Sequence, residues 1–165
     1  MSAKEAFLET YDREHATTMR VLRAYPADQA DLKPGERSNS ARQIAWIFVL
    51  ENYLGQKIWN DEFKNGVTPG NPPKAPQNWS EIVEATEKAA GEFRALVDGA
   101  SPEELAQKVH FMVAPKTLGE MTRSDVMWFL LHDQIHHRGQ LSVYLRIAGG
   151  KVPSIYGPSG DEPWF

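Results

Sequence analysis

The chain has 165 residues, a length that fits one domain over residues 1–165 with its own hydrophobic core. Its net charge is −4, so it lacks the basic surplus of a nucleic-acid-binding protein. It contains no cysteine, which excludes disulfides, thiolate ligands and a cysteine nucleophile. A charged N-terminus and the absence of an apolar run of about 20 residues predict a cytoplasmic protein without a membrane partner.

Helix-capping patterns divide the chain into segments. They predict four long helices, at about 3–24, 41–60, 80–98 and 123–148, and a short helix that begins at Pro102. Each start has a capping pair three residues apart: Ser2/Glu5, Ser40/Gln43, Asn78/Glu81, Ser101/Glu104 and Thr122/Asp125. No segment shows convincing strand alternation. The predicted fold is therefore all-α, a four-helix bundle.

The connections predict how the helices are arranged. The linker at about 61–79 is rich in proline and glycine, and it is long enough to run back along a whole helix. The third long helix can then run parallel to the second, which gives an up-down-down-up topology. The tail "VPSIYGPSGDEPWF", at 152–165, is too apolar to be a free linker. We expect it to be ordered, either over the mouth of a site or against a second subunit.

Polar side chains interrupt the apolar faces of three helices. At 3.6 residues per turn, Asp133 and His137 fall on the apolar face of their helix, whereas His132 and His136 fall toward the opposite side. Glu51 interrupts the apolar face of the helix at 41–60. On the first helix, His15 takes the inward position, at about the same level.

Two interpretations of this convergence stay open. An unpaired buried carboxylate costs several kcal/mol, so a bound cation is one way to compensate this cost. One divalent ion (zinc, nickel, iron or manganese) is then predicted, with His137, Asp133, Glu51 and His15 as its ligands. The other solution is a buried ion pair without metal, in which Glu51 pairs with His15. Tyr144, two turns beyond His137, is either a hydrogen-bond donor to a substrate or a core residue.

Three segments resemble the DinB-like superfamily, also called damage-inducible or YfiT-like metalloenzymes. They are "HHRGQLSVYLRIAGG" (136–150), "SNSARQIAWIFVLEN" (38–52) and "DLKPGERS" (31–38). The resemblance covers essentially the whole chain. It implies an up-down-down-up four-helix bundle that holds a divalent metal through one histidine on the second helix and two on the last.

This sequence departs from that family pattern at two positions. Asp133 stands where the first histidine of the last helix would lie, and Ile47 stands near the usual histidine of the second helix. Glu51, one turn later, is the substitute on the same face, and His15 could restore the lost nitrogen ligand.

The resemblance also implies a function. Relatives include thiol-dependent transferases and isomerases, so we expect a metal-dependent thiol transferase or hydrolase. Its substrate would be a small molecule such as a low-molecular-weight thiol, and the protein would be a homodimer. No catalytic residue is indicated beyond the metal ligands. The alternative is a non-catalytic, stress-related ligand-binding bundle whose inner histidine and carboxylates are structural.

Overall fold

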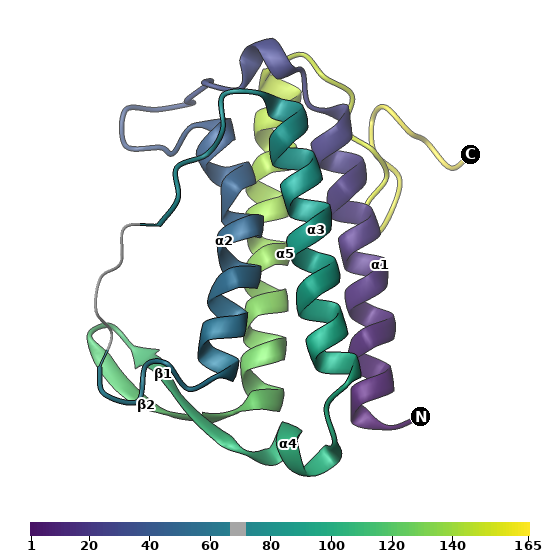
Figure 1. Ribbon diagram of the computed structural model, residues 1–165. Coiled ribbons are helices and arrows are strands. Elements are labelled where there is room, and N and C mark those ends of the chain that lie inside the picture. The colour runs from purple at the N-terminus through teal and green to yellow at the C-terminus, as the bar shows by residue number, and fades with distance from the viewer. Residues whose placement is uncertain (67–71) are drawn as a thin grey trace.

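The computed structural model describes residues 1–66 and 72–165. The long helices lie side by side (Figure 1). The elements in chain order are α1 (Ala3–Ala24), the 3₁₀ turn η1 (Ala27–Gln29), α2 (Ala41–Trp59), α3 (Trp79–Asp98), α4 (Pro102–Ala106), β1 (Lys108–Ala114), β2 (Thr117–Thr122) and α5 (Arg123–Ile147). The predicted helix bounds agree with these within one residue at each end.

Capping chemistry explains why the helices begin where they do. The Ser2, Ser40 and Ser101 side chains each accept a hydrogen bond from the backbone N–H three residues later, and the Glu or Gln there reaches back to the serine N–H. Thr122 caps α5 through the N–H of Asp125. Asn78 is the exception, because its side chain makes no such bond and instead contacts that of Glu81.

Hydrogen bonds between helix ends show how the helices pair. Lys4, at the start of α1, donates to the carbonyls of Asp98 and Ala100 after α3, and Trp79, at the start of α3, donates to the Leu22 carbonyl of α1. These two helices are therefore antiparallel. Arg123, at the start of α5, donates to the carbonyl at the end of α2, so α2 and α5 are antiparallel as well. Residues 67–71 of the predicted crossover linker lie outside the described residues.

A β-hairpin corrects the all-α prediction. β1 and β2 pair antiparallel, with His110 opposite Glu120, and the turn places Lys116 at φ 58°. The segment "VHFMV" is rich in β-branched and aromatic residues, but at seven residues the strand is too short to stand out between two helices. The hairpin is held against the end of α2 because Asp61 accepts hydrogen bonds from both the backbone N–H and the ring Nδ1 of His110.

Two apolar clusters fill the space between the helices. One, toward the hairpin, includes Phe7, Ile58, Phe93 and Leu130, and the other, toward the far end, includes Leu22, Phe48, Ile82 and Leu145. The C-terminal tail joins the second cluster through buried Val152. Within the described residues, no helix is both long and apolar enough to cross a membrane.

Gly55 allows α2 to approach its neighbours closely. A Cβ atom at this position would lie 2.8 Å from Leu130 Cδ1 and 2.8 Å from Phe93 Cε2, and both side chains are buried. We expect Gly55→Ala to lower the free energy of unfolding by about 1–3 kcal/mol through overpacking. Gly91→Ala, where a Cβ would meet nothing, is the control and should gain about 0.5–1 kcal/mol. Urea unfolding of both variants tests this, and equal shifts would contradict it.

Candidate metal site

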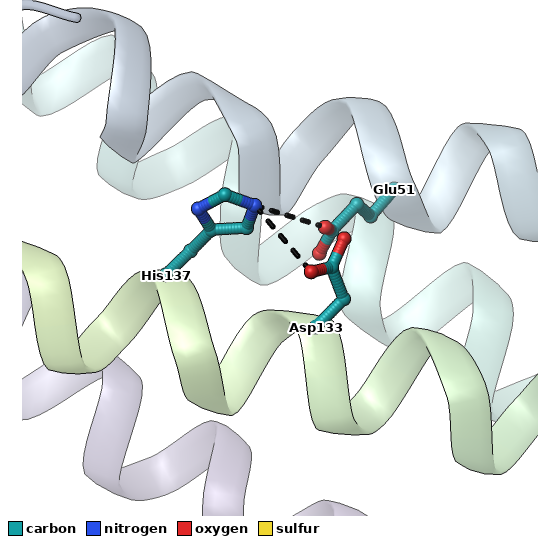
Figure 2. A group of neighbouring side chains, drawn as sticks. All are labelled: Glu51, Asp133 and His137. Atoms are coloured by element: carbon teal, nitrogen blue, oxygen red, sulfur yellow. Dashed lines mark ion pairs between the residues drawn. The ribbon is translucent and has the colours of Figure 1, made fainter. Parts of the chain in front are cut away.

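Glu51, Asp133 and His137 form a group of ligand-type side chains between α2 and α5. Asp133 and His137 are one helical turn apart on α5, and Glu51 faces them from α2 (Figure 2). One ligand atom of each lies within 4.8 Å of the other two. The structure thus brings together three of the four residues that the sequence predicted as metal ligands.

The spacing of these atoms suits a shared ion better than direct hydrogen bonds. His137 Nε2 lies 3.8 Å from Glu51 Oε1 and 3.7 Å from Asp133 Oδ1. A tetrahedral ion with ligand bonds of about 2.1 Å would separate its donors by roughly 3.4 Å. Side-chain shifts of a few tenths of an ångström, well within the freedom of these side chains, would bring the atoms to that separation. The residues present therefore fit a divalent ion.

Glu51 is the residue that most needs a partner. It is 5% exposed, and neither carboxylate oxygen has a hydrogen-bond partner within the described part of the chain. Burial, reinforced by the neighbouring Asp133 carboxylate, raises the pKa of Glu51 to about 10. A carboxylate in this environment requires either a proton or a cation.

Exposure increases from Glu51 toward the surface. The His137 side chain is 18% exposed and that of Asp133 is 42% exposed. The group therefore has a closed end at Glu51 and an open edge at Asp133. A small molecule in solvent can reach an ion bound here.

His15 lies outside this group. Its half-buried ring stacks on that of Tyr11 at 6.3 Å. Burial lowers the pKa of His15, and the charges that bear on it are Glu87, Asp12 and Arg23. His15 lies on α1, which packs chiefly on α3 and α5, and it does not belong to the group that α2 and α5 form.

The sequence interpretation missed a second polar cluster, at Glu14, Arg138 and Tyr156. Arg138 is 1% exposed and donates to the Glu14 carboxylate at 2.7 Å, to the Glu14 carbonyl at 3.0 Å and to the Tyr156 hydroxyl at 2.6 Å. The Tyr156 hydroxyl also lies 2.7 Å from Glu14 Oε2. The C-terminal tail is therefore fastened to α1 and α5. Tyr156 contacts Glu14 and Arg138, and no tail residue belongs to the metal-ligand group in the described part of the chain.

Tyr144 lines a cleft beside the candidate site. Its hydroxyl donates to the Asn39 carbonyl at 3.0 Å. The cleft, about 440 Å³, lies between α5 and the start of α2, and its lining includes Tyr144, Gln140, Arg37 and Ile44. Gln140 in turn contacts His137, so the cleft borders the candidate metal site.

The two remaining histidines of α5 face outward, as predicted. His132 and His136 are both exposed, and neither belongs to the ligand group. The ring of His132 lies against Trp128, and His136 contacts Gln140.

The fold and site define a helical protein with a carboxylate–histidine group of metal-ligand type between two long helices. The chain belongs to the DinB family, whose family model matches residues 1–163. Over 157 residues, it is 25% identical to the uncharacterized protein YrdA of Bacillus subtilis (strain 168). The aligned region covers 94% of this chain and 89% of YrdA.

Solved structures share the fold. A DinB-like protein from Bacillus cereus ATCC 10987 superposes with a TM-score of 0.76 at 24% identity, covering 92% of this chain and 97% of that one. The DinB-like protein YjoA from Bacillus subtilis gives a TM-score of 0.67 at 17% identity, with 90% and 96% covered. A conserved protein from Enterococcus faecalis gives 0.63 at 16% identity, with 90% and 97% covered.

Proposed function

We propose that this protein is a metal-dependent enzyme of the DinB-like superfamily that holds one divalent ion through Glu51, Asp133 and His137. The observation that carries the proposal is the buried Glu51 carboxylate, which has no hydrogen-bond partner among residues 1–66 and 72–165 and faces a second carboxylate and an imidazole. A shared cation neutralises both carboxylates at once. The surrounding helices would form the up-down-down-up bundle of the family.

The ligand types narrow the choice of ion. One imidazole and two carboxylates suit zinc, nickel, iron or manganese. A bound ion of this kind would lower the pKa of a coordinated water or thiol. Three protein ligands leave coordination positions for a substrate, so His15 is not needed to complete the site.

The open edge of the site suggests what the substrate is. We propose a small molecule, such as a low-molecular-weight thiol, that reaches the ion past Asp133 and occupies the cleft lined by Tyr144. The reaction class is thiol transfer or hydrolysis, which the family resemblance favours. The Tyr144 hydroxyl already donates its hydrogen to the Asn39 carbonyl. It would therefore accept a hydrogen bond from the substrate, or the Tyr144 ring would contact the substrate instead. Assembly as a homodimer and a cytoplasmic location stay predictions.

A second candidate function is a non-catalytic ligand-binding bundle. The raised pKa of Glu51, to about 10, favours it, because a protonated carboxyl at neutral pH needs no cation. Under this alternative the Glu51, Asp133 and His137 group is structural. No turnover with any thiol and no bound metal would then be found.

Metal analysis separates the two functions. Protein purified without a histidine tag should carry, or take up from added zinc, nickel or manganese, about one ion per chain. Asp133→Ala and His137→Ala should each lower occupancy at limiting metal, because each removes a ligand. His132→Ala and His136→Ala are matched controls on the same helix and should keep the ion. A protein that takes up no metal would overturn the proposal, and loss of metal in the control variants alone would overturn the ligand assignment.

A further inference from the structure

Gln140 lies between two histidine rings on the surface of α5. Its Oε1 is 3.1 Å from His137 Nδ1, and its Nε2 is 2.9 Å from His136 Nε2. The side chain is exposed, and it also lines the cleft beside the site. It therefore contacts a candidate metal ligand without belonging to the ligand group.

The two ends of the amide have different hydrogen-bonding roles. The Oε1 atom can only accept, so the hydrogen bond to His137 requires a proton on Nδ1 of that ring. The Nε2 group can only donate, so His136 accepts with an unprotonated Nε2. When Gln140 Nε2 donates to His136, the amide oxygen is turned toward His137.

The position of the single proton on neutral His137 decides what its other nitrogen can do. With the proton on Nδ1, Nε2 carries a lone pair, and this is the atom that lies 3.7–3.8 Å from the Asp133 and Glu51 carboxylates. A lone pair facing two carboxylates can bind a cation. The opposite tautomer would direct an N–H at the carboxylates. It would partly satisfy them by hydrogen bonding, and it would leave no lone pair on Nε2 to bind a metal.

We propose that Gln140 is a positioning residue that selects the metal-binding tautomer of His137, with His136 fixing the orientation of the Gln140 amide. The role of the tautomer in metal binding rests on the proposed function. The selection of the tautomer itself does not, because it rests on the contacts of Gln140 with His137 and His136, which the chain makes without an ion. Partners that donate or accept at the second imidazole nitrogen are a general means of fixing a ligand histidine.

Ring ¹⁵N chemical shifts of the metal-free protein at pH 8 test the selection directly. In the wild type, His137 should show a protonated Nδ1 and an unprotonated Nε2. Gln140→Leu removes the acceptor and should shift both signals toward a mixture of tautomers. Gln140→Glu keeps an acceptor and should restore the wild-type pattern. Unchanged His137 signals in Gln140→Leu, or an Nδ1 without a proton in the wild type, would overturn the proposal.

Metal affinity supplies a second readout. In competition with a chelator, Gln140→Leu should bind zinc about 10–100-fold more weakly, while Gln140→Glu should bind at least as tightly as the wild type. Equal losses in both variants would overturn the role in metal binding, because they would show that the site needs glutamine for its shape. If the wild-type protein binds neither zinc nor nickel nor manganese, the proposed function fails, and the ¹⁵N shifts still decide whether Gln140 selects the tautomer.

Discussion

Replacing Glu51 by glutamine is expected to stabilise the metal-free protein at pH 8 and to abolish metal binding. Folding buries this carboxyl and raises its pKa from the ordinary value of 4.5 to about 10, so the folded state binds a proton that the unfolded state releases. Between these two values, wild-type stability falls as the pH rises. The slope is about 1.4 kcal/mol per pH unit, or about 4 kcal/mol between pH 5 and pH 8. Glutamine cannot ionise, so this part of the pH dependence disappears.

Urea unfolding in the presence of a chelator, at pH 5, 6.5 and 8, measures this effect. Glu9→Gln is the matched control, because Glu9 is exposed on α1 and should leave the slope unchanged. The variant and the wild type should differ little at pH 5 and most at pH 8. If Glu51→Gln instead loses stability at every pH, the carboxylate is ionised and paired in the folded protein, which contradicts the raised pKa.

Added zinc should narrow the difference in stability between the wild type and Glu51→Gln at pH 8. A ligand at 100 times its Kd stabilises the folded state by about 2.7 kcal/mol, and the wild type alone should show this gain. A residue that weakens the metal-free fold but is required for binding is typical of a functional site. The same substitution therefore distinguishes a metal ligand from a core residue.

Local signals were sufficient to predict the helices. Capping boxes at Ser2, Ser40 and Ser101 act within one turn, so the sequence predicts them without knowledge of the packing. The hairpin was missed because its pairing joins two short segments, and Val109 is the one strand residue that is fully buried. Its attachment through His110 and Asp61 spans 49 residues, which no local pattern reveals.

The site was only partly predictable because apolar faces of helices are broad. His15 is half-buried on α1 and lies outside the ligand group, while the neighbouring Glu14, on the stripe that holds Tyr11 and Thr18, is buried. On α5, the fully buried polar residues are Gln134 and Arg138, because this helix packs on α1 as well as on α2. A helix that is buried on two sides has no single apolar face, so phasing against one face does not reveal that Arg138 is buried.

The Glu14–Arg138 pair should be the most sensitive point for stability. Glu14→Ala leaves the Arg138 guanidinium buried without its carboxylate, and we expect a loss of about 3–5 kcal/mol in the free energy of unfolding. Burial raises the pKa of Glu14, but the hydrogen bonds from Tyr156 and Arg138 outweigh it and lower the pKa overall. The stabilisation is therefore present above pH 4.5 and lost as the pH falls through the lowered value.

Replacing both charged residues separates the cost of an unpaired charge from the value of the pair. The double variant Glu14→Met/Arg138→Met should lose far less than Glu14→Ala, because it leaves no buried charge. Tyr156→Phe removes two hydrogen bonds, one from Arg138 and one to Glu14, and should cost about 2 kcal/mol, with faster proteolysis of the tail. Urea unfolding and limited proteolysis measure these effects. If Glu14→Ala costs no more than Tyr156→Phe, Arg138 reaches solvent in the variant and the cluster is not the anchor that its burial indicates.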